Sequence, residues 1–206
     1  MTIRQRKETW DDEYEKKGAI WRGVPELEMR LEDGQRVLEL GCGNGKTLAA
    51  LSSHDVKVVG IDFSISSLRL CQRLRSTNVD LVQANAVELP FKEGSFQVVI
   101  CHHMFEHLYL EERRKAAEEI ARVLCPNGTL HFQAFSVLDM RYGRGQPLEE
   151  NTFFRGDGIL YHYFQDDEIM ELFPTLQLLS CHHRSIKKRY YGVETMRDRL
   201  SATLRK

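Results

Sequence analysis

Short apolar runs alternate along the chain with segments whose apolar residues recur every three or four positions. Short continuous apolar runs predict buried strands. They lie at residues 35–40, 57–62, 80–84, 97–101 and 129–135. Helical spacing predicts helices at 45–51, 65–74 and 111–124, the last one ended by the Pro-Asn-Gly at 126–128. Such an alternation is typical of an α/β fold, a parallel sheet with helices on both faces.

The pattern breaks after residue 135. Residues 136–164 hold four glycines and a proline among aromatic and charged residues, without regular periodicity. A loop of that length in a compact domain is typically one that covers a site. We therefore expect a substrate-covering insertion there. Beyond it, the sequence predicts a short helix at 166–173 and strands at 176–180 and 190–193.

Length and composition indicate one globular domain spanning residues 1–206. Hydrophobic content of 42% and charged content of 29% exclude a disordered chain. The five cysteines are odd in number and form no C-x-x-C pair, which excludes a disulfide framework and a zinc knuckle. No apolar run reaches the roughly 18 residues of a transmembrane helix, and the start lacks the apolar stretch of a secretory signal. We expect a cytoplasmic protein that does not associate with membranes.

Charge is distributed unevenly although the formal net charge is only −1. The last 25 residues carry eight basic and two acidic side chains, a net charge of +6. A solvated surface and a patch for a phosphate-bearing substrate both explain this segment. RNA is therefore one partner class that the sequence leaves open.

A glycine-rich loop joins the first predicted strand to the helix after it. Gly41, Gly43 and Gly45 alternate with Cys42 and Asn44, a pattern that differs from the G-x-G-x-x-G of nicotinamide-binding proteins. Small residues there let the backbone turn tightly and approach a ligand. Glu39 precedes the loop, and Asp62 ends the next strand, where a carboxylate can accept hydrogen bonds from both hydroxyls of a ribose.

These motifs resemble those of the class I S-adenosylmethionine-dependent methyltransferases, specifically a type 11-like methyltransferase domain. Residues 39–45 and 60–64 resemble the first two motifs of that family. Residues 83–91, 95–100 and 122–130 resemble three further motifs in the same order, with Asn85 and Gln97 where the family usually has Asp. The resemblance implies a Rossmann-like fold with a mostly parallel seven-stranded sheet. It also implies that residues 1–34 form a leading segment that folds over the cofactor.

The cofactor implied by the resemblance is S-adenosylmethionine, with S-adenosylhomocysteine as its product. The glycines would line its methionine and ribose, Asp62 would bind the ribose hydroxyls, and Phe63 would pack beside the adenine. The residues that the resemblance assigns to the cofactor are Tyr14, Glu39, Gly41, Cys42, Gly43, Gly45, Asp62, Phe63, Asn85, Ala86 and Cys101.

Two histidines that follow the fourth predicted strand are the candidate catalytic residues. A general base is needed only if the acceptor must lose a proton, and His102 and His103 are the candidates because imidazole titrates near neutral pH. The candidate substrate-binding residues are Trp21, His107, Arg141, Tyr161 and His162.

The same run contains H-x-x-E-H from His103 to His107, the zinc motif of the inverzincin hydrolases. That motif needs a helix and a further ligand, whereas this run follows directly on a buried strand and fits the methyltransferase pattern. We therefore expect no metal site.

The acceptor that we expect is a small molecule, with RNA and protein as alternatives. Residues 156–169 resemble a segment of small-molecule methyltransferases and of tRNA wobble-uridine methyltransferases. The absence of net positive charge argues against RNA. A second alternative is a non-catalytic binding partner that keeps the methyltransferase fold, since Asn85 and Gln97 depart from the family pattern.

Overall fold

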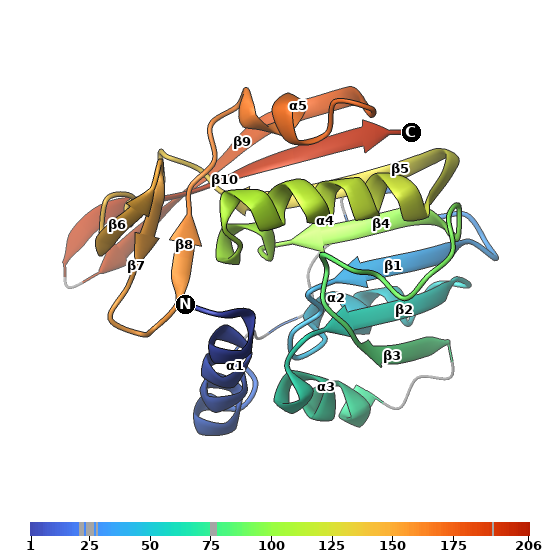
Figure 1. The fold of residues 1–206 in the computed structure, drawn as a ribbon, viewed down its shortest axis with the longest axis horizontal. Helices are drawn as coiled ribbons and strands as arrows, with labels where there is room; N and C mark the ends of the chain where they lie inside the picture. Colours follow the sequence, from blue (N-terminus) through green and yellow to red (C-terminus); the bar gives the residue numbers. More distant parts are fainter. Residues whose placement is uncertain (21–22, 24–26, 28, 75–77, 191) are drawn as a thin grey trace.

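The computed structural model describes residues 1–20, 23, 27, 29–74, 78–190 and 192–206. A seven-stranded sheet forms its centre, in the order β3-β2-β1-β4-β5-β10-β9 (Figure 1). Its strands are β1 (Arg36–Leu40), β2 (Lys57–Asp62), β3 (Val79–Gln83), β4 (Phe96–His102), β5 (Leu124–Phe135), β9 (Gln177–Tyr190) and β10 (Val193–Arg205). The first five strands are parallel, whereas β10 runs antiparallel to both β5 and β9. The predicted mostly parallel seven-stranded sheet is confirmed.

Helices cover both faces of this sheet, as predicted. In Figure 1, α4 crosses in front of the strands, whereas α2 lies behind them. The helical elements are α1 (Ile3–Lys17), α2 (Lys46–Leu51), α3 (Ile65–Cys71), the 3-10 turns η1 (Gln72–Leu74) and η2 (Phe105–His107), α4 (Leu110–Val123) and α5 (Glu168–Leu172). None of the helices in the described part of the chain is both long enough and apolar enough to cross a membrane.

Two hydrophobic cores lie on opposite faces of the sheet because side chains alternate along each strand. Val99 and Cys101 of β4 join the core under α4, whereas Val98 and Ile100 join the core against α2 and α3. From Val98 to Cys101, β4 is apolar and buried on both faces, which is typical of a central parallel strand.

The junction of α4 and β5 differs from the prediction. The helix ends at Val123, because Leu124 already has extended backbone angles, and β5 continues through the Pro-Asn-Gly at 126–128. A Cβ atom on Gly128 would lie 2.9 Å from the carbonyl oxygen of Cys125, so only glycine fits this close approach. Pro126, two residues after the C-cap Leu124, prevents the helix from continuing, as predicted, and the Pro-Asn-Gly also forms part of the start of β5.

The insertion at 136–164 is more ordered than the loop we expected. It contains a small antiparallel sheet of β6 (Gln146–Glu149), β7 (Thr152–Phe154) and β8 (Leu160–His162). These strands have only three or four residues, too few to show an alternating pattern.

The predicted strand at 190–193 is wrong. One strand, β9, ends at Tyr190, and the next, β10, begins at Val193. These residues therefore flank the tip of a long hairpin. β9 and the first residues of β10 are largely exposed and polar, so they lack the apolar runs that marked the central strands.

Helix α1 lies within the described part of the leading segment. Thr2 caps its first turn in a capping box with Gln5. Asp11 accepts hydrogen bonds from the hydroxyl of Ser64, at 2.6 Å, and from the backbone N–H of Ser66, at 3.1 Å. These bonds hold α1 against the start of α3.

Candidate active site

A cavity of about 320 Å³ lies where the parallel strands end, beside α1. The carboxyl ends of β1, β2, β3 and β4 contribute to its walls, and the order of strands reverses between β1 and β4. Such a reversal is where open α/β sheets bind ligands. The opposite wall of the cavity is formed by two strands. Near its carboxyl end, β5 contributes Gln133 and Phe135, and β10 contributes Arg197 and Arg199.

The glycine loop forms one wall and depends on backbone angles that favour glycine. Gly41 has a φ angle of 69°, and a Cβ atom there would lie 2.6 Å from Cγ of Met104. Glycine at this position therefore lets the loop backbone pack closely against Met104.

Asp62 holds the glycine loop against the end of β2. Its carboxylate accepts hydrogen bonds from the backbone N–H groups of Gly43 and Ser64, each at 2.9 Å. Burial raises the pKa of Asp62 to about 6, although these backbone donors favour the ionised form. The carboxylate lines the cavity and keeps lone pairs that can accept further hydrogen bonds.

Glu39 lies beside Asp62 on the same wall. Burial raises its pKa to about 8, and a hydrogen bond from the side chain of Thr47 partly opposes that rise. Within the described part of the chain, its Oε2 atom has no hydrogen-bond partner. A buried acceptor of this kind at a cavity wall fits a donor such as an ammonium group.

Most of the predicted cofactor residues come together around the cavity. Those that line it are Tyr14, Glu39, Gly41, Cys42, Gly43, Asp62, Phe63, Asn85 and Ala86. Gly45 does not, because it is the N-cap of α2. Cys101 does not, because its side chain lies in the core under α4.

The two candidate bases have different surroundings. Burial, together with His103 and His131, lowers the pKa of His102 to about 3, which keeps its imidazole neutral. His103 has a φ angle of 58°, an uncommon backbone conformation for a residue other than glycine. Its backbone N–H donates to the carbonyl of Gln133 at 2.7 Å, which fixes this turn.

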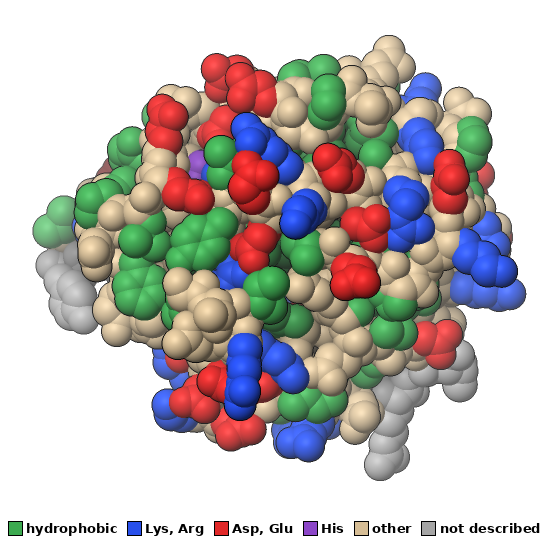
Figure 2. Space-filling view, viewed as in Figure 1, with side chains coloured by type: hydrophobic (Ala, Val, Ile, Leu, Met, Phe, Trp, Pro, Cys, Tyr) green, Lys and Arg blue, Asp and Glu red, His purple; other side chains and the backbone are tan. Residues whose placement is uncertain are grey.

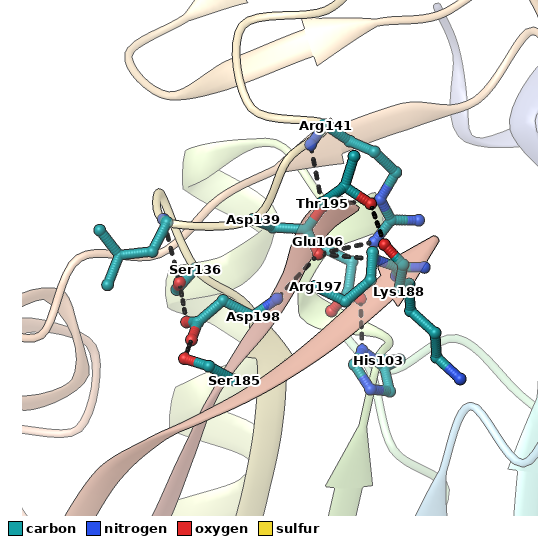
Figure 3. A network of polar contacts seen from close by, with 11 residues as sticks. His103, Glu106, Ser136, Asp139, Arg141, Ser185, Lys188, Thr195, Arg197 and Asp198 are labelled. Atoms are coloured by element: carbon teal, nitrogen blue, oxygen red, sulfur yellow. Dashed lines mark hydrogen bonds and ion pairs between the residues drawn. The ribbon is translucent and has the colours of Figure 1, made fainter. Parts of the chain in front are cut away.

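A buried carboxylate orients His103 (Figure 3). Oε1 of Glu106 lies 2.8 Å from Nδ1 of His103, and Glu106 is fully buried. An ionised Glu106 accepts a hydrogen bond from Nδ1–H, which leaves Nε2 as the proton acceptor. The ring of His103 lies 4.6 Å from that of Phe135, on the cavity wall.

Of the predicted substrate-binding residues that the structure describes, His107 alone lines the cavity. His107 lines it, with Nδ1 2.8 Å from the carbonyl of Leu160 and its ring edge-on to Trp10 and Tyr161. Tyr161 itself lies behind His107 and does not line the cavity.

Arg141 and His162 do not line the cavity either. His162 is buried between Thr152 and Glu168, each 2.8 Å from a ring nitrogen. Arg141 pairs with Asp139 and stacks on Phe135 from outside the cavity. Trp21 lies outside the described residues.

The zinc-motif residues form no metal site. The two histidines at the ends of H-x-x-E-H turn to separate partners, Glu106 and the carbonyl of Leu160. In the described part of the chain, no group of three His, Cys, Asp or Glu side chains is arranged to hold a metal ion.

Sequence reasoning missed several residues of the cavity wall. Gln133 and Phe135 end a predicted strand, so their place at the carboxyl edge could have been inferred. Arg197 and Arg199 could not, because their position depends on the register of β10 against β5. The missed residues are Ile3, Arg6, Lys46, Thr47, Ile61, Ala84, Met104, Leu108, Gln133, Phe135, Arg197 and Arg199.

Two of the known proteins to which this chain is similar are named as methyltransferases. The O-methyltransferase rstn1 of Aspergillus nomiae is 35% identical over 152 residues, which cover 68% of this chain and 64% of that protein. A tRNA N(3)-cytidine methyltransferase of Danio rerio is 29% identical over 168 residues, which cover 69% of this chain and 44% of that protein. The chain therefore spans less than two thirds of the length of either relative.

A solved structure supports the fold. A SAM-dependent methyltransferase from Methanosarcina mazei superposes with a TM-score of 0.73 at 22% identity, covering 87% of this chain and 99% of that one. Residues 38–132 match the model of the methyltransferase domain family. This part of the chain contains the glycine loop, Asp62 and the His103 turn. Residues 38–132 are therefore the part of the chain that matches the methyltransferase domain family that its motifs resemble.

Proposed function

We propose that this protein transfers a methyl group from S-adenosylmethionine to a small-molecule acceptor in this cavity. The observation that carries the proposal is the division of the cavity into two chemically different halves. Glu39 and Asp62 line one half, and the histidine held by Glu106 lines the other. A donor with an ammonium group and ribose hydroxyls fits the first half, and an acceptor that loses a proton fits the second.

The residues of the donor half fit the cofactor. Oε2 of Glu39, which has no hydrogen-bond partner among the described residues, would accept from the amino group of the methionine moiety. Asp62 accepts from the ribose hydroxyls, and Phe63 packs beside the adenine. When bound, S-adenosylmethionine supplies an electrophilic methyl group on a sulfonium.

The acceptor half positions the nucleophile and removes its proton. Holding acceptor and methyl donor in line contributes up to about 7–11 kcal/mol. His103 Nε2 takes the proton of an acceptor hydroxyl, and Glu106 stabilises the imidazolium through Nδ1. His102 stays neutral and shapes the wall.

Two observations favour tRNA as a second candidate acceptor. One relative is named as a tRNA methyltransferase, and the exposed hairpin of β9 and β10 carries most of the basic C-terminal residues. Against it stands the net charge of −1, because binding to an RNA backbone depends mainly on positive charge.

Label transfer tests the proposal. The protein is incubated with methyl-labelled S-adenosylmethionine and cell extract separated into small-molecule, RNA and protein fractions. We expect label in the small-molecule fraction. Label in RNA alone would support the second candidate, and absence of label together with failure to bind S-adenosylhomocysteine would support a non-catalytic protein.

Matched variants link the activity to this cavity. His103→Asn is expected to lower methyl transfer by about 10²–10⁴-fold without weakening S-adenosylhomocysteine binding. His54→Asn is the control, because His54 is exposed and remote from the cavity. Equal activity of the two variants would exclude His103 as the base.

A further inference from the structure

The hairpin of β9 and β10 sorts its charges between its two faces. Side chains alternate along a strand, so Arg197 and Arg199 share one face of β10. On β9, Arg184 pairs in register with Arg199, and Lys188 pairs with Thr195, which places both cations on that same face. This face, defined by these four residues, is called the cationic face below.

The acidic residues of the hairpin lie on the opposite face. Glu194 forms an ion pair with Lys187 at 2.7 Å. Asp198 accepts hydrogen bonds from the hydroxyls of Ser136 and Ser185, on the side of the sheet that α4 covers. Figure 2 views the molecule from that side, and acidic and basic side chains are interspersed there. The cationic face differs from this mixed surface, because the four charged residues that define it are all basic.

The cationic face continues into the acceptor half of the cavity. Phe135 pairs in register with Arg199, and His102 pairs with Gln133, so these residues share one face of the sheet. Both Arg197 and Arg199 line the cavity. The cavity's carboxylates, Glu39 and Asp62, lie at the ends of β1 and β2, on the other side of β4.

Arg197 is held in place by a shared carboxylate (Figure 3). Oδ2 of Asp139 accepts from Nε of Arg197 at 2.8 Å, and Oδ1 accepts from Nε of Arg141 at 2.8 Å. Two guanidinium groups share one carboxylate, so the group keeps a net positive charge beside Phe135. Burial and, to a smaller extent, the nearby Arg184 lower the pKa of Arg199, because both make its charged form less favourable. An anion at this position would lower the energy of both arginines.

We propose that the acceptor is a small organic anion whose carboxylate or phosphate binds Arg197 and Arg199 while its apolar part lies against Phe135. This inference rests on the proposed function and specifies its substrate class. Arg184 and Lys188 extend the positive field outward and favour the approach of an anion. One charged group can contact both arginines in the cavity, whereas the chain's net charge of −1 disfavours the long polyanionic backbone of RNA.

Binding of matched probes tests the inference. Benzoate and benzamide have nearly the same shape but differ in charge, and each is titrated with and without S-adenosylhomocysteine. We expect benzoate to bind at least about tenfold more tightly than benzamide, since charge-assisted hydrogen bonds to an arginine are strong. Arg199→Gln and Arg197→Gln should each remove most of that preference. Arg205→Gln is the control, because Arg205 lies on the same strand but far from the cavity.

Benzamide that binds as tightly as benzoate, or no binding of either probe, would overturn the inference. An equal preference for benzoate in Arg199→Gln, Arg197→Gln and Arg205→Gln would also overturn it. In the label-transfer assay, the methylated product should be retained on an anion-exchange column. A labelled small molecule that is not retained would refute the inference and leave the proposed function standing, whereas label in RNA alone would refute both.

Discussion

At the scale of single residues, the two buried carboxylates are the clearest sign of a binding site. Burial raises the pKa of Glu39 to about 8 and that of Asp62 to about 6. Carboxylates that serve only the fold are usually paired with cations, which lowers the pKa. A raised pKa of a carboxyl group at a cavity wall therefore indicates that the group binds a positively charged or hydrogen-bond-donating ligand.

Asp62→Asn is expected to weaken binding of S-adenosylhomocysteine about 10- to 100-fold. The amide removes the charge that strengthens hydrogen bonds to the ribose hydroxyls. Isothermal titration calorimetry measures the effect. Asp80→Asn, at an exposed position of β3, is the matched control and should bind like the parent protein. Unchanged affinity in Asp62→Asn would show that this carboxylate does not contact the ligand.

Cofactor binding should release protons between pH 6 and 8. Below pH 8 the carboxyl of Glu39 is mostly protonated in the free protein, and an ammonium group beside it favours the ionised form. Affinity should therefore fall as the pH drops from 8 to 6, by up to about tenfold per unit. Calorimetry in buffers of different ionisation enthalpy should detect release of about one proton at pH 7. Affinity independent of pH in this window would contradict the role of Glu39.

At the scale of elements, the turn between β4 and η2 organises the acceptor half. The left-handed backbone of His103 directs the chain from the sheet edge into η2, which places Glu106 three residues later against the same imidazole. A residue in an uncommon conformation beside a cavity is typical of a functional turn.

Glu106→Gln is expected to lower kcat for methyl transfer by about 10²-fold without changing the affinity for S-adenosylhomocysteine. The amide cannot stabilise the imidazolium by charge, so the pH profile should also shift. Glu106→Asp should restore part of the activity. The matched control is Glu118→Gln, on the exposed side of α4. A kcat like that of the control would show that Glu106 serves only the fold.

Elements with continuous apolar runs could be predicted from the sequence, and exposed elements could not. The strand at 57–62 matches β2, because its interior residues Val58–Ile61 form the short apolar run of a parallel strand buried on both faces. Of the hairpin of β9 and β10, only the start of β9 was predicted, at 176–180. The rest was missed because its exposed face is polar and β5, which pairs with β10, is distant in the sequence. The glycine loop and Asp62 could be recognised because each is a local motif. The arginines at the cavity could not, since only strand register brings them there.

At the scale of the whole molecule, an aromatic cluster joins the insertion and α5 to the sheet. The ring of Phe132 on β5 lies 5.4 Å from Phe105, 5.3 Å from Phe164 and 6.0 Å from Phe173. Phe132 is almost fully buried. This cluster therefore links η2, which carries Glu106, to segments far along the chain.

Phe132→Ala is expected to lower the free energy of unfolding by about 3–5 kcal/mol, since it leaves a cavity among three rings. For a chain of this size, the melting temperature should fall by roughly 6–20 °C. Calorimetric melting checks this. Leu138→Ala is the control, because Leu138 is 60% exposed, and it should melt within a few degrees of the parent protein. Equal melting of the two variants would contradict the packing described here.

A crystal structure of the protein soaked with S-adenosylhomocysteine tests the central claim most directly. We expect one molecule of S-adenosylhomocysteine in the cavity, with its ribose hydroxyls within hydrogen-bond distance of Asp62 and its amino group beside Glu39. The sulfur should face the side of the cavity that holds His103 and Arg199. A molecule bound elsewhere, or no bound molecule at a concentration that saturates related enzymes, would contradict the claim that this cavity is the site of methyl transfer.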